Sequence, residues 1–216
     1  MIFFDTETTG LDCSCCRIIE LAMLTVENWE IVDEYDEFVH IGEPLDSEIT
    51  ELTGISDEML SDYGVYEDIV AEDLKEKMTP GTVMVAHNCQ FDLSFVYELL
   101  KRHYPQETDD IVSNVDWIDT LTVLKDRKKY PHKLVDAVRH YGIEDVNYHR
   151  AIDDTKALYE VTKAMKCELD NIKEYKNYFG YNPKFGRSGV EFNFIEYKPQ
   201  PYRYGDDIAD IILPDK

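Results

Sequence analysis

Short apolar runs, and longer stretches with apolar residues every three or four positions, divide most of the chain into expected strands and helices. Apolar or alternating runs predict strands, over residues 2–5, 17–26, 31–40, 82–86 and 115–119. Helical spacing predicts helices, over residues 46–53, 66–78, 91–103, 121–126, 133–141 and 151–175. Three strands followed by strands that alternate with helices predict an α/β fold with a mixed five-stranded sheet flanked by helices.

The end of the chain has a different pattern. Residues 176–216 combine several glycines and prolines with many aromatic residues and show no regular period. Glycine and proline interrupt helices and strands, so this segment is expected to be irregular or briefly extended. We therefore predict an α/β domain over residues 1–175 and an aromatic-rich extension, residues 176–216, packed on it.

Charge is distributed unevenly along the chain. The 216 residues carry a net charge of −23. Residues 1–80 contain 3 basic and 22 acidic residues, a net of −19, whereas residues 81–216 contain 19 and 23, a net of −4. This composition argues against a protein that coats long duplex DNA. It leaves room for a protein that contacts a few nucleotides through bound cations.

Nothing in the sequence predicts export or membrane insertion. No apolar run approaches the roughly 18 residues of a membrane span, and the N-terminal residues lack the basic start of a secretion signal. The five cysteines, three of them at Cys13, Cys15 and Cys16, suit a reducing compartment better than a disulfide framework. We expect a cytoplasmic protein without membrane contact, with these three as reduced thiols in a surface loop rather than as a zinc site.

Two carboxylates follow the first predicted strand. Asp5 and Glu7 are two positions apart, so both point to the same face of an extended strand. Neighbouring carboxylates at a buried strand end repel one another, and desolvation adds to the cost. Hard divalent cations with oxygen ligands relieve this repulsion, and Mg²⁺ or Mn²⁺ fits. A solvated acidic turn explains this motif alone equally well.

A second motif spans residues 87–92 and follows the predicted strand 82–86. Asn88 is predicted to cap the next helix. Asp92 then lies in the first helical turn, where the helix dipole favours a charged carboxylate. Taken by itself, this motif is better explained as a helix cap than as a functional site.

A third motif spans residues 149–154. A helix is expected to begin near Ala151, which places Asp154 in its first turn and His149 on the preceding loop. A loop histidine with an ordinary pKa is suited to act as a general base. Asp153 lies about 100° around the helix from Asp154 and is expected to face away. The alternative is a surface histidine before an acidic helix start.

The order of the three motifs is more specific than any one of them. Residues 1–170, with Asp5 and Glu7, then Asp92, then His149 and Asp154, resemble the DEDDh exonucleases, the family of the proofreading epsilon subunit of bacterial DNA polymerase III. Residues 51–55 and 118–121 also resemble family stretches. The resemblance implies a ribonuclease H-like fold. It also implies hydrolysis of the phosphodiester bond at a nucleic-acid 3′ end, which releases nucleoside monophosphates.

This resemblance leads to a mechanistic hypothesis. Two divalent ions, Mg²⁺ or Mn²⁺, are expected about 4 Å apart across the scissile phosphate. Their expected ligands are Asp5, Glu7, Asp92 and Asp154, and the expected general base is His149. Thr6 and Thr8 are expected to contact the terminal nucleotide through their backbone, and Asn88 to line the substrate groove.

The sequence leaves the substrate and the partners open. Single-stranded DNA or a frayed DNA end is the favoured substrate, and trimming of RNA ends is the first alternative, because nothing in the sequence reads the 2′-hydroxyl. A non-catalytic nucleic-acid-binding or polymerase-accessory module on the same fold is the second. A proofreading role would require a polymerase partner in trans.

Two further groups of residues have competing interpretations. The basic residues within 125–133 are equally compatible with a grip on phosphates and with a solvated helix end. Tyr197, Tyr202 and Tyr204 lie near Lys198 and Arg203, and aromatics interleaved with cations suit stacked single-stranded bases. Packing against the domain is the favoured role for these tyrosines. His87 and Phe91 are expected to be structural.

Overall fold

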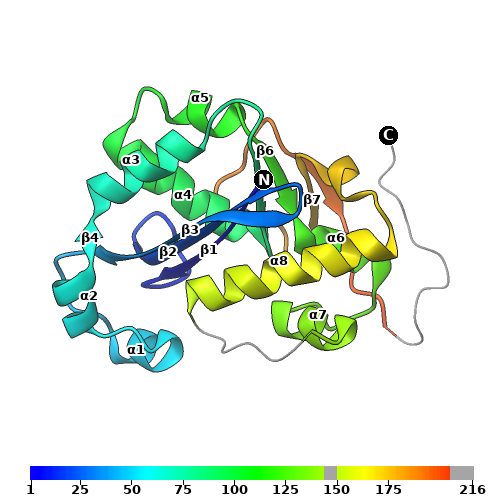
Figure 1. Ribbon diagram of the computed structural model, residues 1–216, viewed down its shortest axis with the longest axis horizontal. Coiled ribbons are helices and arrows are strands. Elements are labelled where there is room, and N and C mark those ends of the chain that lie inside the picture. Colours follow the sequence, from blue (N-terminus) through cyan, green and yellow to red (C-terminus); the bar gives the residue numbers. More distant parts are fainter. Residues whose placement is uncertain (144–149, 205–216) are drawn as a thin grey trace.

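One mixed sheet with helices on both faces organises the protein (Figure 1). The computed structural model describes residues 1–143 and 150–204. Within them the sheet has eight strands in the order β4-β3-β2-β1-β5-β6-β7-β8. The strands are β1 (Ile2–Thr8), β2 (Ile18–Glu27), β3 (Glu30–His40), β4 (Val65–Tyr66), β5 (Val83–Ala86), β6 (Asp116–Asp119), β7 (Tyr178–Tyr181) and β8 (Glu196–Pro199). The pairs β1–β2 and β2–β3 are antiparallel, and every other neighbouring pair is parallel.

The helices form two layers and one peripheral pair. Helices α3 (Glu67–Lys77), α4 (Cys89–His103) and α5 (Thr108–Ser113) cover one face of the sheet. Helices α6 (Thr120–Arg127), α7 (Leu134–Tyr141) and α8 (Ala151–Glu168) cover the other, together with the 3-10 helix η1 (Ile172–Tyr175). Helices α1 (Ser47–Thr53) and α2 (Asp57–Tyr63) pack with a small separate cluster beside β3.

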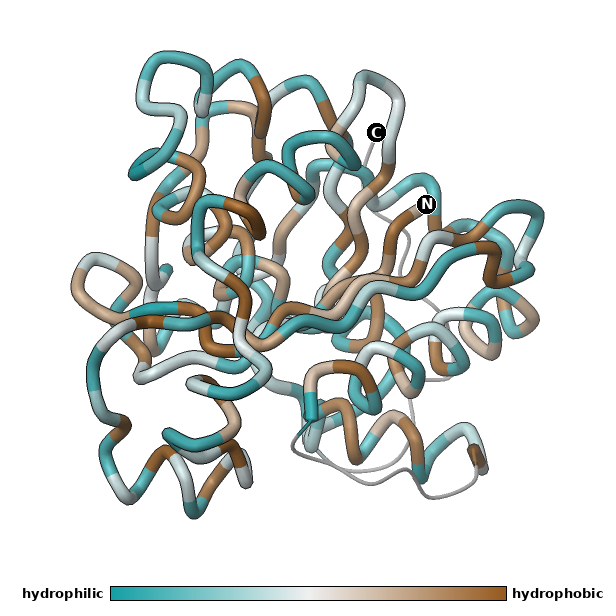
Figure 2. The backbone as a smooth tube through the Cα atoms, turned by 60° about the vertical axis from the view of Figure 1, so that its left-hand side comes forward, coloured by the Kyte–Doolittle hydropathy of each residue, from teal (hydrophilic) through white to brown (hydrophobic). Residues whose placement is uncertain are grey.

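The alternation of side chains along β1 builds both halves of the core. Phe4 points into the cluster that includes α3 and α4, whereas its neighbour Phe3 points into the cluster that includes α8. Both rings are fully buried, and burial of such a side chain contributes about 1.5–3 kcal/mol. Figure 2 shows the apolar positions along the central strands and polar residues on many of the surrounding loops. Strand β1 lies between β2 and β5 in the sheet, and its pairing with β2 continues past Phe4 to Thr8.

The α/β class and the five predicted strands are confirmed, and the sheet is wider than expected. The tight turn at Asn28 and Trp29, where both residues have positive φ, joins β2 to β3 as a hairpin. Strands β4, β7 and β8 and helices α2 and α5 were not predicted. The prediction of one helix over residues 151–175 is wrong at its end, because α8 stops at Glu168 and a separate 3-10 helix follows.

The extension joins the sheet as regular strands. Strand β7 pairs with β6 and β8 pairs with β7, both in parallel. Asn177 fixes this junction, because its Oδ1 accepts a hydrogen bond from Trp117 N at 2.8 Å and its Nδ2 donates to Asp116 Oδ1 at 3.0 Å. The expectation of an irregular or briefly extended segment is thus met, because two strands of four residues each join the sheet and residues 182–195 and 200–204 contain no helix or strand.

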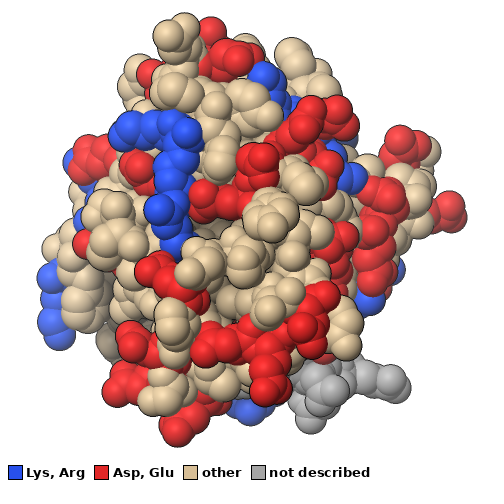
Figure 3. Space-filling model, turned by 90° about the vertical axis from the view of Figure 1, so that its left-hand side faces the viewer, with Lys and Arg blue, Asp and Glu red and all other residues tan. Residues whose placement is uncertain are grey.

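One face of the molecule carries many acidic side chains. Figure 3 shows this face, where Asp and Glu cover much of the surface and Lys and Arg form a short band. The cysteine loop lies only partly at the surface, because Cys13 is buried against the core while Cys15 is exposed. Burial raises the pKa of the Cys13 thiol. Among the helices in residues 1–143 and 150–204, none is long and apolar enough to cross a membrane.

Candidate active site

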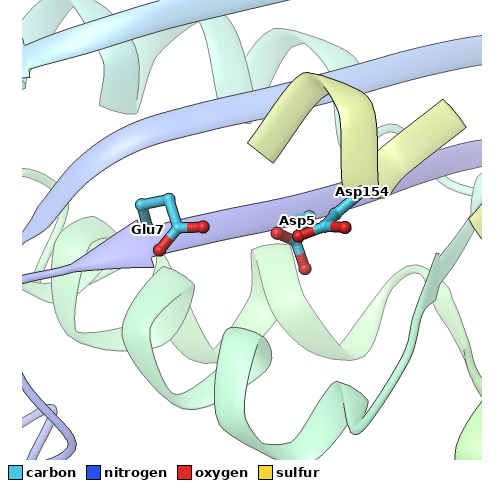
Figure 4. Close-up of side chains that lie close together, drawn as sticks. All are labelled: Asp5, Glu7 and Asp154. Atoms are coloured by element: carbon cyan, nitrogen blue, oxygen red, sulfur yellow. The ribbon is translucent and has the colours of Figure 1, made fainter. Parts of the chain in front are cut away.

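Three carboxylates meet where the end of β1 faces the first turn of α8. Asp5, Glu7 and Asp154 each offer an oxygen, and these oxygens all lie within 4.8 Å of one another. In Figure 4 the carboxylates of Asp5 and Asp154 lie side by side, and that of Glu7 follows along the strand. The alternation predicted for Asp5 and Glu7 is thus observed, and both side chains share the face of β1 that carries Phe3.

The sheet leaves this end of β1 open on one edge. Strand β5 pairs with β1 only at Ile2 and Phe3, so Asp5 and Glu7 extend past the end of β5. On the other edge, β2 accompanies β1 throughout and pairs with Asp5 and Glu7. The site is therefore flanked by β2 and α8, and β5 does not extend beside it.

Asp92 reaches the same region from the opposite face of the sheet. It lies in the first turn of α4, is 3% exposed, and accepts a hydrogen bond from Thr6 Oγ1 at 2.7 Å. Thr6 points to the α4 side because it alternates with Asp5 and Glu7. The Thr6 hydroxyl thus orients Asp92, while the backbone of Thr6 remains in the strand. In this arrangement Asp92 stands beside the three-carboxylate cluster rather than within it.

Burial and mutual repulsion make it costly to ionise these groups together. Burial raises the pKa of Asp5 well above its usual range, and Asp92, Asp154 and Glu7 add to the effect. Burial also raises the pKa of Glu7 to about 7, with further contributions from Asp154 and Glu20. The pKa of Asp92 is raised to about 7 by burial, although the bond from Thr6 opposes the change. Protons or cations must therefore accompany the cluster at neutral pH.

The donors present fit a hard divalent cation. All are carboxylate oxygens, which Mg²⁺ and Mn²⁺ prefer over softer ligands. Their separation allows several of them to reach one ion, and the raised pKa values show that the fold holds them together at a cost. Asp5, Glu7 and Asp154 would hold the ion directly, and Asp92 lies close enough to raise the pKa of Asp5.

Glu20 fixes the start of α8 and was not singled out from the sequence. It is fully buried on β2 opposite Glu7, where Oε1 accepts a hydrogen bond from Arg150 Nε at 2.7 Å and Oε2 accepts one from Ala151 N at 3.0 Å. These bonds satisfy a backbone donor at the helix N-terminus and anchor the turn that carries Asp154. The available signal was an acidic residue inside an otherwise apolar strand.

The prediction that the side chain of Asn88 caps α4 is wrong. Asn88 occupies the N-cap position of α4, but it has φ of 70° and its side chain makes no capping bond. Asp119 takes that role, because its Oδ1 accepts hydrogen bonds from Asn88 N at 2.9 Å and Cys89 N at 3.2 Å. The same carboxylate caps α6 through Leu121 N at 3.0 Å. The side chain of Asn88 is consequently exposed and free to face a ligand.

The remaining predicted residues have mixed outcomes. His149 lies outside the described residues. The prediction that His87 is structural is confirmed, since its ring bonds to Thr120 Oγ1 at 2.9 Å and to the carbonyl of His132 at 2.8 Å. Phe91 packs against the core beside Phe95, as expected. Thr8 is buried and donates to the carbonyl of Gly10 at 2.7 Å.

Comparison with known proteins identifies the family. A family model described as "Exonuclease" matches residues 2–162. The chain is 35% identical over 179 residues to "DNA polymerase III PolC-type" from Bacillus cereus and 35% identical over 186 residues to its namesake from Bacillus subtilis. These matches cover 81% and 84% of this chain but only 12% of either relative.

Solved structures show the same fold at low sequence identity. The structure of E. coli exonuclease I in complex with a dA16 oligonucleotide aligns with a TM-score of 0.71 and 18% identity, covering 81% of this chain and 42% of that one. Exonuclease X in complex with 5′ overhanging duplex DNA aligns with a TM-score of 0.58 and 19% identity, covering 81% and 95%. With its carboxylates at the end of β1 and the starts of α4 and α8, the chain belongs to the exonuclease family, in the DEDD group on the ribonuclease H-like fold.

Proposed function

We propose that this protein is a metal-dependent 3′→5′ exonuclease that hydrolyses the terminal phosphodiester bond of DNA, with single-stranded or frayed ends preferred, and releases nucleoside monophosphates. The observation that carries the proposal is the Asp5–Glu7–Asp154 cluster, which concentrates negative charge that only cations or protons can balance. Membership of the exonuclease family supports the same conclusion.

Each residue of the site has a distinct proposed task. Asp5, Glu7 and Asp154 would hold two divalent ions, with Asp92 completing the set. Bound there, such ions supply charge neutralisation at the phosphate and a lowered pKa for a coordinated water. Thr6 holds Asp92 in place. His149 is the proposed general base that takes a proton from the attacking water.

Substrate positioning would come from the backbone near these carboxylates. The peptide groups of residues 6–8 lie at the end of β1 beside the cluster, where a terminal nucleotide would have to sit for its phosphate to reach it. The exposed side chain of Asn88 borders the same edge of the sheet and is proposed to contact the sugar-phosphate chain.

The preference for DNA rests on the relatives. The exonuclease I structure contains a DNA oligonucleotide, and the curated relatives are named as DNA polymerases. A polymerase partner for this chain is proposed on the same ground, since proofreading requires a polymerising activity to supply the 3′ end.

A substrate panel tests the proposal. Purified protein with Mg²⁺ or Mn²⁺ is expected to release labelled monophosphate from a 3′-labelled single-stranded DNA, and EDTA is expected to stop the reaction. Duplex DNA with paired ends and a matched RNA are expected to react more slowly. Faster cleavage of RNA would reassign the substrate, and no metal-dependent release from any substrate would leave the non-catalytic alternative.

A further inference from the structure

A groove lies at the carboxyl edge of the sheet, beyond the ends of β5, β6 and β7. It consists of two adjoining hollows of about 170 and 460 Å³ that share Asn88, Leu121 and Tyr202. Asn88 follows β5, Leu121 follows β6, and Tyr181 ends β7. Because β1, β5, β6 and β7 are parallel, these positions lie at the same edge as Asp5 and Glu7.

The groove is close enough to be reached by a nucleic acid whose 3′ end lies at the carboxylate cluster. Three strand spacings of about 4.8 Å separate β1 from β7, or roughly 15 Å. Asn88 also stands at the start of α4, one turn before Asp92. A nucleic acid with its 3′ terminus at the cluster would therefore meet the groove with the nucleotides that precede the terminus.

Four aromatic rings form a continuous band, of which three line the groove and the fourth, Tyr204, contacts Tyr130. Tyr130 contacts both Tyr202 and Tyr204, with ring centroids 4.9 and 5.4 Å apart. Phe185 continues the band at 6.2 Å from Tyr202. Tyr130, Phe185 and Tyr204 are 48%, 67% and 70% exposed, so large apolar faces are presented to solvent. Exposed rings of this kind can stack with successive bases irrespective of their sequence.

Three basic side chains line the groove, where they could contact the phosphates of a bound nucleic acid. Lys125, Lys133 and Arg187 line the groove in a protein that is otherwise strongly acidic. Two carboxylates, Asp119 and Asp136, line it as well, and both accept hydrogen bonds from backbone N–H groups. Lys125 is largely buried beside Gly180, and burial lowers the pKa of its ammonium, a cost that a nearby phosphate would offset. Arg127 and Lys128 contribute differently, because they bind residues at the end of α8.

Hydrogen bonds fix the extension that completes the groove. Gln200 Nε2 donates to Thr122 O at 3.0 Å and to Asp126 Oδ1 at 2.7 Å, while Tyr130 N donates to Arg203 O at 3.0 Å. These bonds hold Tyr202 against Tyr130 before any ligand arrives. A pre-formed groove loses less conformational entropy on binding than a flexible tail would.

We propose that the groove between α6 and the extension, with its band of Tyr130, Tyr202, Tyr204 and Phe185 and its cations Lys125, Lys133 and Arg187, binds the single-stranded nucleotides that precede the 3′ end. The inference rests on the proposed exonuclease function and adds a holding site that residues outside the family match supply, since Phe185, Arg187, Tyr202 and Tyr204 all follow residue 162. Tyr197 has another role, because its hydroxyl donates to Gln90 at 2.9 Å and packs the extension on α4.

Binding measured without hydrolysis tests the groove directly. The full chain is titrated into a fluorescent single-stranded (dT)12 in EDTA, and anisotropy reports the Kd. Tyr130→Ala combined with Phe185→Ala is expected to weaken binding about ten-fold or more, whereas Tyr130→Trp retains it. The matched control combines Tyr63→Ala with Tyr66→Ala, two exposed tyrosines that do not line the groove. Equal weakening by both double variants, or none by the groove variant, would overturn the proposal.

A mononucleotide substrate separates this inference from the proposed function. Hydrolysis of the p-nitrophenyl ester of thymidine 5′-monophosphate with Mn²⁺ engages only the candidate active site. The groove double variant is expected to keep the wild-type rate on this ester while losing affinity for (dT)12. If the wild type cleaves neither the ester nor (dT)12 in the presence of Mn²⁺ but still binds (dT)12 through the groove, the exonuclease proposal is refuted and the groove proposal stands. Loss of ester hydrolysis in a folded groove variant would show that these residues serve the active site instead.

Discussion

The carboxylate cluster and the aromatic groove lie on the same edge of the sheet but have opposite physical character. The cluster, Asp5, Glu7 and Asp154, is acidic and costly to ionise without cations. The groove presents exposed rings and positive charge that suit a polyanion. The cluster lies within residues matched by the family, and the groove depends on the extension beyond them. The contrast indicates that cleavage and strand holding are separable properties of this chain.

The largest expected effect concerns the charge at the centre of the cluster. Asp5→Asn is expected to reduce hydrolysis of single-stranded DNA by about 10³-fold or more, because cation binding is lost. The same change is expected to raise the melting temperature in EDTA, since it removes buried repulsion. Activity and thermal unfolding are measured on the same preparation. A variant that is both inactive and less stable in EDTA would contradict a cluster under repulsion.

A smaller loss of nuclease activity is expected from changing Glu20, which anchors the start of α8. Glu20→Gln keeps the shape of the side chain but leaves one acceptor oxygen for two donors, Arg150 Nε and Ala151 N, so the turn that carries Asp154 is held less precisely. Activity is expected to fall about 10- to 100-fold, the usual range for residues that orient metal ligands. Asp36→Asn is the matched control, because Asp36 contacts the same arginine at 3.6 Å from a more exposed position. Equal effects of the two changes would show that Arg150, and not the capping bond to Ala151, is what matters.

The cluster also predicts an unusual dependence of stability on pH. Burial raises the pKa of both Glu7 and Asp92 to about 7, from 4.5 and 3.8. Between these values the folded state binds protons that the unfolded chain has released, so the contribution of these groups to stability falls as pH rises to 7 and above. In EDTA, the melting temperature of the wild type relative to Glu7→Gln is expected to fall by several degrees from pH 5 to pH 8, at about 2–4 °C per kcal/mol.

Added Mg²⁺ provides the control for that pH profile. It is expected to restore the melting temperature at pH 8 more than at pH 5, because protons and metal ions compete for the same carboxylates. A melting temperature of the wild type that rises relative to that of Glu7→Gln as pH increases would contradict the raised pKa of Glu7.

The smallest expected effect belongs to the groove. Arg187→Ala is expected to lower the dependence of (dT)12 binding on salt by about 0.7 in the slope of log K against log salt, the value for one phosphate contact on a single strand. Lys101→Ala, at the opposite end of α4 from Asn88, serves as the control and is expected to leave the slope unchanged. An unchanged slope for Arg187→Ala would remove this residue from the groove's phosphate contacts.

Local rules predict where each carboxylate of the cluster lies on its own strand or helix, and the resemblance to the DEDDh exonucleases led to the prediction that they meet. Strand alternation is sufficient to place Asp5 and Glu7 on one face, and the start of a helix places Asp154 in its first turn. The roles of Glu20 and Asp119 depend on contacts across 131 and 31 positions, which no local pattern reveals. Asn88 was predicted to cap α4 from its residue type alone, whereas its backbone has a positive φ and the carboxylate of Asp119 accepts the capping bonds.

The groove could not be predicted because it, too, is formed by residues that are far apart in the sequence. Strands β5 and β6 are equally short but contain apolar runs, whereas β7 contains Gly180 and β8 is mostly polar and ends at Pro199. The basic residues of 125–133 were treated as one group, but the fold directs Lys125 and Lys133 to the groove and Arg127 to the end of α8. Which side chains share a surface is set by the tertiary structure.

The most direct test of the central claim compares two neighbouring aspartates. A 5′-labelled single-stranded DNA is incubated with Mg²⁺ and wild type, Asp154→Ala or Asp153→Ala, and shortening is followed by electrophoresis. Asp154 belongs to the cluster, and among the described residues Asp153 does not. We predict a ladder of products shortened from the 3′ end for wild type and Asp153→Ala, and nearly none for Asp154→Ala, with all three folded. Wild-type shortening by Asp154→Ala would contradict the account.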